Sequence, residues 1–457
     1  CSNSDFIYCK SFGAYPKQGI YLFSILILCM NDYIKFLIIL FLSVVQVLLV
    51  ITVFNWWVDP YGIFHVAEYD PKKPIWVSKQ LRLAKVHRLK QLKPQGIVLG
   101  SSSSQLGIDP SHPGWDQDVY PRYNAGLPGA SLYETFRFFQ HSQAVSHPKQ
   151  ILIGLDFITF NIFYSLSNDF NESHMAVSKE GKPQDSFSNN FFLPLLSMPA
   201  LKASQRKLFY VGEGTHYSNG MENPQVKGRG LSNNRGAMVG TIKKVVFNLV
   251  MPPPGHRFCL YDGGGNNPNF LYLKKILEIS KENGSDVRLF IQPAHAFLME
   301  VLRVLRRMED YEKWERELIA IVEDVNNRYA ESREFPLWNF GGYNSLTMTE
   351  IPPPEDPTRS MNWYFDIPHY KKSLGDLIQD RVFNFHQTGR VVPEDFGTLI
   401  NSKNIDRHQK VQKLKQRDYM KTYQEDIKEL TEKVNTTEKN IRLFDCNQLA
   451  SRLQIKS

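Results

Sequence analysis

Four consecutive serines directly follow a short apolar segment in the stretch GIVLGSSSSQLGIDP, residues 96–110. A serine hydroxyl is a candidate nucleophile where a neighbouring base can remove its proton. Such a base occurs far downstream in YFDIPHY, where Asp366 and His369 are three residues apart. This spacing lets the carboxylate orient the imidazole while the other ring nitrogen faces a serine. The residues therefore predict a Ser-His-Asp triad that needs no metal and no cofactor.

Each motif also has a simpler interpretation. A run of serines is commonly a turn or linker, and an Asp three residues before a His is commonly a helix cap beside a surface side chain. Both motifs, however, occur where an apolar strand or turn is expected to meet a helix. Their joint occurrence at such junctions favours catalysis.

Other candidate groups also follow predicted strands, where the chemistry of an open parallel sheet gathers. YNAGLPGAS contains Asn124 and Gly126, and the Gly126 N–H is a candidate donor to a developing oxyanion. GLDFITFN places Asp156 at a strand end, where it either joins the site or hydrogen-bonds the glycine-containing loop. His295, in QPAHAF, either contacts substrate or has a structural role at the start of a helix.

Together these segments resemble the SGNH (GDSL-like) hydrolase superfamily over about residues 94–385. GSS at 100–102 matches the family's nucleophile block, and this alignment makes Ser102 the nucleophile. NAG at 124–126 matches the glycine block, and DIPH at 366–369 matches the late Asp-x-x-His block.

The third block departs from the family. Where the family has Gly-x-Asn-Asp, this chain has GLDF at residues 154–157. The family asparagine donates to the oxyanion, whereas an ionised aspartate only accepts hydrogen bonds. Asn161 is predicted as a substitute donor. The altered block also favours an alternative, in which the chain is a non-catalytic SGNH-fold interaction protein in an envelope assembly.

The chain looks most like the membrane-anchored branch of this superfamily, which includes the D-alanyl transfer protein of teichoic acid modification and the alginate O-acetylation proteins. The resemblance implies a serine esterase or O-acyltransferase acting on acyl esters of a cell-surface glycan or polymer, often beside a multi-spanning acyltransferase. Ser102 would attack the acyl carbonyl, His369 would carry the proton and Asp366 would orient the imidazole. The N–H groups of Ser102 and Gly126 would stabilise the oxyanion. Hydrolysis and transfer both remain open.

Short apolar runs that alternate with helical patterns predict an α/β fold with a mainly parallel sheet. We expect a three-layer sandwich of the SGNH or flavodoxin-like type. Strands are expected at 97–99, 150–157, 287–292 and 336–340, and helices at 131–145, 269–283, 294–308, 311–330 and 371–383. Residues 165–268 are interpreted as an insertion of long loops, and residues 386–457 as a charged helical segment.

Residues 36–54 are 19 nearly uninterrupted apolar residues, enough to cross a hydrocarbon core of about 30 Å. Two tryptophans follow, so residues 30–57 are interpreted as an uncleaved transmembrane signal anchor. The lysines before residue 36 predict a cytoplasmic N-terminus and an extracytoplasmic bulk. The resemblance implies that the chain passes once through the cytoplasmic (inner) membrane and that its bulk is periplasmic. Residues 1–29 precede the first methionine and are interpreted as a candidate non-native upstream segment.

The formal net charge is +8, and residues 58–93 form a basic juxtamembrane segment that reads as a helix. Eight Lys or Arg residues and no acid lie between 72 and 93. This stretch either rests on anionic headgroups or an anionic polymer, or is a solvated helix face. A surface protein that binds anions through it is a third hypothesis, whereas nucleic acid is excluded for an extracytoplasmic domain. Of five cysteines only Cys259 and Cys446 follow the anchor, which allows one disulfide and no zinc-ligand spacing.

Overall fold

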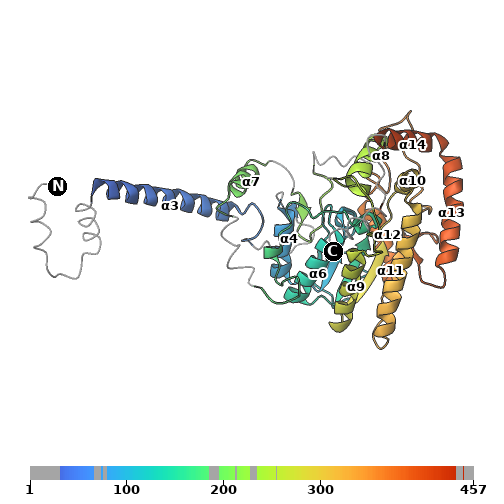
Figure 1. Cartoon of the computed structure of the whole chain (residues 1–457), viewed down its shortest axis with the longest axis horizontal. Helices are drawn as coiled ribbons and strands as arrows, with labels where there is room; N and C mark the ends of the chain where they lie inside the picture. The colour runs from blue at the N-terminus through green and yellow to red at the C-terminus, as the bar shows by residue number, and fades with distance from the viewer. Residues whose placement is uncertain are drawn as a thin grey trace, which may run out of the picture. The chain divides into compact units, whose positions relative to one another are not determined.

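The computed structural model describes residues 31–65, 74–75, 80–184, 195–210, 214–226, 234–253, 255–438 and 446. Two compact units make up the chain: Cys1–Pro60 with Phe191–Phe209, and Tyr61–Asn190 with Tyr210–Ser457 (Figure 1). The interpretation of residues 1–29 as an upstream segment lies outside the described residues. So do Lys72, Lys73 and Lys79 of the basic stretch.

The larger unit is built on a six-stranded sheet in the order β3-β2-β4-β6-β7-β8. All neighbours pair in parallel except β7 and β8, which are antiparallel. The prediction of an α/β fold with a mainly parallel sheet is therefore confirmed. The strands are β2 (Gly96–Leu99), β3 (Arg122–Asn124), β4 (Gln150–Leu155), β6 (Asp286–Ile291), β7 (Leu337–Asn339) and β8 (Thr398–Leu399).

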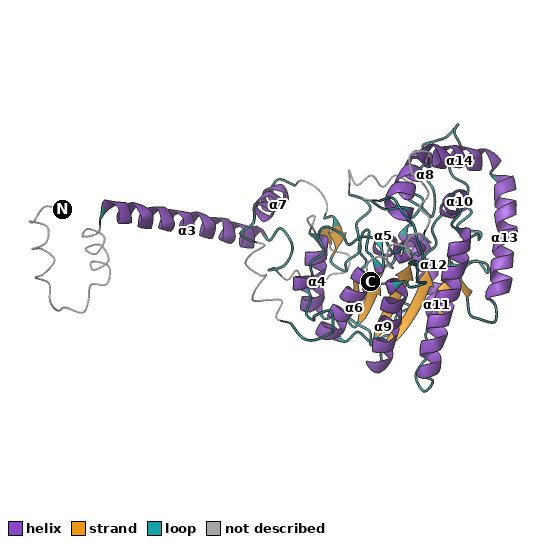
Figure 2. Cartoon of the chain, in the orientation of Figure 1, coloured by secondary structure: helices purple, strands orange, loops and turns teal. Residues whose placement is uncertain are grey.

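Helices follow or precede the strands and pack side by side along the sheet. Helix α6 packs on α4 and α9, and α9 packs on α11, so these four form a row (Figure 2). Helix α6 begins at a capping box, in which Ser131 and Glu134 satisfy each other's backbone N–H. The helices are α4 (Leu81–Leu92), α5 (Ser102–Gly107), α6 (Leu132–Ser146), α9 (Pro268–Glu282), α10 (Ala296–Val304), α11 (Met308–Arg328) and α12 (Lys372–Phe383).

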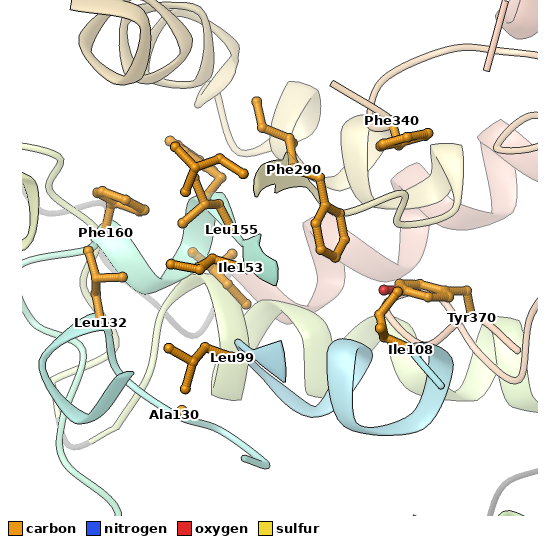
Figure 3. Packing of buried hydrophobic residues seen from close by; sticks show 14 of the residues in the cluster. Leu99, Ile108, Ala130, Leu132, Ile153, Leu155, Phe160, Phe290, Phe340 and Tyr370 are labelled. Atoms are coloured by element: carbon orange, nitrogen blue, oxygen red, sulfur yellow. The ribbon is translucent and has the colours of Figure 1, made fainter. Parts of the chain in front are cut away.

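Apolar side chains from the central strands form the core. Leu99, Ile153, Leu155 and Phe290 are essentially inaccessible to solvent, and Figure 3 shows them converging between the strands and helices. Strands β2 and β4 are buried along their whole length, which explains their continuous apolar sequence. Tyr370 from the Asp-x-x-His segment also enters this core, so the packing of the core helps to fix the late motif.

The expected loop-rich insertion contains more helix than the sequence indicated. It includes α7 (Met198–Leu208), α8 (Arg235–Lys244) and a π-helix, η3 (Val245–Val250), besides a short strand, β5 (His216–Tyr217), that pairs with β1 (Pro74–Ile75). Near the C-terminus α13 (Ile405–Thr422) and α14 (Gln424–Glu438) form a helical pair, and α14 packs on α8 and α10.

The smaller unit contains α3 (Asp32–Val58), a helix of 27 residues with a mean hydropathy of 3.0 over its most apolar 18 residues. None of that apolar window is buried inside the protein. By length and composition α3 is apolar enough to cross a membrane, which agrees with a single N-terminal anchor.

Candidate active site

The tetraserine lies at the turn between β2 and α5. Gly100 has φ +138°, and a Cβ at this position would lie 2.8 Å from the Gly154 carbonyl oxygen, so only glycine fits between β2 and β4. Ser101 then caps α5, because its hydroxyl accepts the Ser103 N–H. Ser102 is the first residue of the helix and is exposed to a cleft. The run of serines is thus a strand-to-helix turn that presents one hydroxyl.

The late motif meets this turn. Ser102 Oγ lies 2.8 Å from His369 Nε2, and His369 Nδ1 lies 2.7 Å from Asp366 Oδ1. Asp366 also accepts the backbone N–H of His369 at 3.0 Å, which fixes the carboxylate relative to the ring. The Ser103 hydroxyl donates to the Pro368 carbonyl at 2.7 Å and ties α5 to the Asp-x-x-His segment. Residues 267 positions apart in sequence therefore share one hydrogen-bonded chain.

Asn124 fastens the loop after β3. Its Nδ2 donates to the carbonyls of Ser104 and Ile108, and its Oδ1 accepts the Gly126 N–H at 2.9 Å. The Gly126 N–H, predicted as an oxyanion donor, is thus already satisfied by Asn124. Gly126 is needed for a different reason, since a Cβ there would lie 2.9 Å from the Gln105 nitrogen.

The basic helix α4 holds the same loop from its buried side. Lys85 Nζ donates to the carbonyls of Asn124, Gly126 and Gly220 at 2.6–3.0 Å. Arg82 donates to Glu134 and to the Pro128 carbonyl. Burial lowers the pKa of Lys85 to about 7, and the nearby charge of Glu222 opposes this shift.

Lys90 and Lys93 are exposed, but both expectations for the basic stretch are wrong for Arg82, Lys85 and Arg88, which are buried. They neither form a solvated face nor present an anion-binding surface. The physical reason is that a carboxylate and loop carbonyls inside the protein provide partners for Arg82 and Lys85.

Asp156 directly follows β4 and lies in the cleft with Ser102 and His369. Gln292 Nε2 donates to Asp156 Oδ2 at 2.7 Å and to Ser101 Oγ at 3.2 Å, while the Tyr370 hydroxyl donates to Gln292 Oε1. Burial raises the pKa of Asp156 to about 6, although the hydrogen bonds from Ser101 and Gln292 and the charge of His369 oppose this shift.

Sequence reasoning missed Gln292 and Lys85 as contributors to the site. Gln292 follows β6 at the same edge of the sheet as Asp156, so the rule that located Asp156 applies to it as well. Lys85 carried no such signal, because its partners come from two loops that are distant in sequence.

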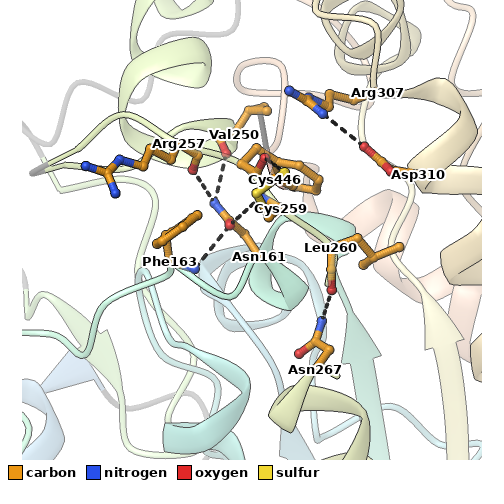
Figure 4. Close-up of a disulfide and its surroundings, with 11 residues drawn as sticks. Asn161, Phe163, Val250, Arg257, Cys259, Leu260, Asn267, Arg307, Asp310 and Cys446 are labelled. Atoms are coloured by element: carbon orange, nitrogen blue, oxygen red, sulfur yellow. Dashed lines mark hydrogen bonds and ion pairs between the residues drawn. A yellow bond between two sulfur atoms is a disulfide. The ribbon is translucent and has the colours of Figure 1, made fainter. Parts of the chain in front are cut away.

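Asn161 and His295 are not brought into the site. Asn161 Nδ2 donates to the carbonyls of Val250 and Arg257, and its Oδ1 accepts from Phe163 and Cys259, so the amide is fully used in holding the insertion (Figure 4). This corrects the expectation of a substitute oxyanion donor.

His295 is completely buried at the start of α10. Its Nδ1 accepts the Phe297 N–H and its Nε2 lies 2.8 Å from the Thr349 carbonyl. Burial lowers the pKa of His295 to about 4. Of the two expected roles, the structural one fits these contacts and substrate contact does not.

An open cleft of about 780 Å³ contains the exposed parts of Ser102, Asp366 and His369. Its other walls include Tyr164, Glu222 and, from α8, Lys244. A volume of this size accommodates a small molecule or part of a polymer. Among the described residues, no cluster of His, Cys, Asp or Glu has the arrangement of a metal site.

Beside Asn161, Cys259 and Cys446 form a disulfide, the pair that the sequence allowed (Figure 4). The bond joins the end of the insertion to a residue beyond α14.

Comparison with protein-family models, curated proteins and solved structures finds no match to this chain.

Proposed function

We propose that the protein is a membrane-anchored, extracytoplasmic serine esterase or O-acyltransferase with an SGNH-like three-layer fold. The observation that carries this proposal is the chain of short contacts from Ser102 through His369 to Asp366. Such contacts are the requirement for an activated serine, since the base must reach the hydroxyl and a third group must orient the base.

In this mechanism Ser102 Oγ attacks the carbonyl carbon of an acyl ester and its proton passes to His369 Nε2. Asp366 holds the Nδ1 proton and stabilises the imidazolium that forms. The tetrahedral intermediate collapses when the ester C–O bond breaks and His369 returns the proton to the departing alcohol. The acyl group is then on Ser102. Water completes hydrolysis, and a sugar hydroxyl completes transfer, in each case with His369 as the base.

Two features support an extracytoplasmic site. Helix α3 provides a candidate anchor, and the Cys259–Cys446 disulfide suits an oxidising compartment. We propose the outer face of the inner membrane, with the bulk of the chain in the periplasm. A cell-surface glycan or polymer is the proposed acceptor or substrate, and a multi-spanning acyltransferase the proposed partner.

The oxyanion side of the site supports a second candidate, a non-catalytic SGNH-fold protein in an envelope assembly. The Gly126 N–H donates to Asn124, and Asp156 stands where a neutral amide donor is expected. A weak oxyanion site would leave the triad without strong stabilisation of the intermediate.

Labelling of purified full-length protein with a fluorophosphonate probe separates the two candidates. The esterase proposal expects labelling that is lost in Ser102→Ala and falls by about 10³-fold or more in His369→Gln. Ser165→Ala is the matched control, because Ser165 lines the same cleft and is exposed, and its labelling should be unchanged. Labelling that persists in Ser102→Ala would exclude Ser102 as the nucleophile.

A further inference from the structure

Helix α7 belongs to the insertion in sequence but packs with α3 in the smaller unit. Asn55 of α3 donates through Nδ2 to the Leu195 carbonyl at 2.5 Å and accepts the Ser204 hydroxyl at 2.7 Å. Lys207 Nζ donates to the Asp59 carbonyl, which follows the last turn of α3. The side chains of Asn55 and Ser204 are fully buried in this contact. Helix α7 is therefore docked at the C-terminal end of α3.

This docking site has a defined depth if α3 crosses a bilayer. The apolar stretch 36–54 spans the hydrocarbon core, so Asn55 lies just beyond it. Trp56 and Trp57 follow and are exposed, as tryptophans are at a membrane interface. Since Asn55 is the residue that holds Leu195 and Ser204, α7 lies at the level of the lipid headgroups.

The outer surface of α7 has the composition that such a location requires. Met198 and Leu208 on α7 are exposed, as are Leu196 and Phe209 just outside its ends, and Phe209 is 83% exposed. Lys202 and Arg206 are exposed on the same helix, and no acidic residue occurs from 195 to 210. Apolar side chains enter the acyl boundary, whereas cations bind lipid phosphates.

We propose that α7 is an interfacial helix that binds the surface of the same bilayer that α3 spans. We propose lipid as the occupant because the exposed apolar and cationic side chains belong to a helix that is docked at the C-terminal end of α3, where the candidate span ends. The proposal does not depend on catalysis at Ser102, so its test uses no activity measurement.

The test places a nitroxide spin label at Phe209→Cys in the full-length protein reconstituted in liposomes. The background carries Ser at Cys1, Cys9 and Cys29 and keeps the Cys259–Cys446 disulfide. Val391→Cys in the larger unit is the matched control, because Val391 is also 83% exposed. Relaxation by oxygen, which enters lipid, and by a water-soluble nickel chelate is measured at each label.

The expected result is that oxygen relaxes the label at 209 more than nickel does, and the label at 391 serves to compare a side chain of equal exposure in the larger unit. A label at 209 that nickel relaxes more than oxygen does would overturn the proposal. A label at 209 shielded from both reagents would also overturn it, because it would indicate contact with protein and not lipid. A third label at Val47 marks the span itself, and exposure of that label to nickel would contradict both the span and the docking depth.

Discussion

The charged side chains around the candidate active site and those on α7 are arranged in opposite ways. Around the site, Arg82 and Lys85 are buried against specific partners, and Asp156 accepts a hydrogen bond from Gln292 at the cleft. On α7, Lys202 and Arg206 are exposed. The sequence indicated a surface helix at α4 and gave no such indication for α7. The role of a basic helix therefore becomes clear only when the partners of its cations are known. The following predictions test this contrast.

The largest effect is expected for Lys85→Met. The methionine side chain occupies similar space but leaves three buried carbonyls without a donor, at a cost of about 1 kcal/mol or more each. We expect a loss of about 3 kcal/mol in the free energy of unfolding, measured on the full-length protein in detergent. Lys202→Met is the matched control on α7, and its effect should stay within about 0.5 kcal/mol. Equal effects of the two substitutions would remove the contrast between the helices.

A pH-dependent effect is expected for Asp156→Asn. Below a pH of about 6 the Asp156 carboxyl is neutral and able to donate a hydrogen bond, and above it the carboxylate only accepts. The kcat/KM of Asp156→Asn divided by that of the wild type should therefore rise between pH 5 and pH 7.5, by about tenfold, with a midpoint near 6. Dividing the two values cancels the titration of groups common to both proteins.

The raised pKa of Asp156 also predicts the direction in which the free energy of unfolding changes with pH. Because the folded pKa is raised, the stabilisation from Asp156 is fully present below its ordinary pKa and is lost as pH rises through about 6. The free energy of unfolding of the wild type should thus fall relative to that of Asp156→Asn as pH rises from 3.8 to about 6.

For the activity prediction, a ratio of the two kcat/KM values that stays flat with pH would show that Asp156 does not act on the reaction.

The smallest effect on stability is expected for Lys202→Gln combined with Arg206→Gln, within about 0.5 kcal/mol. Its consequence should appear at the membrane, where each cation contributes about 1 kcal/mol near an anionic surface. With the label at 209, the difference between oxygen and nickel relaxation should grow with the anionic lipid content in the parent protein. The double variant should lose this dependence while keeping its fold.

The sequence predicted most of the sheet because β2, β4 and β6 are buried along nearly their whole length and read as continuous apolar runs. Strands β3 and β8 were missed, since three and two residues carry too little pattern and depend on pairing with a neighbour. Ser102, Asp366 and His369 lie in one hydrogen-bonded chain, and the sequence grouped them because each lies at a junction that the alternation of strands and helices defines.

The failures concern hydrogen bonds between distant segments. Whether Asn161 faces the cleft or the carbonyls of Val250 and Arg257 depends on how the insertion folds back, which no local pattern determines. Whether the Lys85 side chain points into the protein likewise depends on the loops that contain Gly126 and Gly220, whose carbonyls accept its hydrogen bonds. Residue type and spacing locate a site, but they do not assign each donor to its acceptor.

The link between Cys259 and Cys446 joins a residue made midway through synthesis to one made after every strand of the sheet. In the proposed topology neither sulfur meets an oxidant until it has been exported, so the bond closes only on a molecule whose whole α/β unit has crossed the membrane. A chain that ends before Cys446 would be unable to form this bond, and Cys259 would keep its thiol.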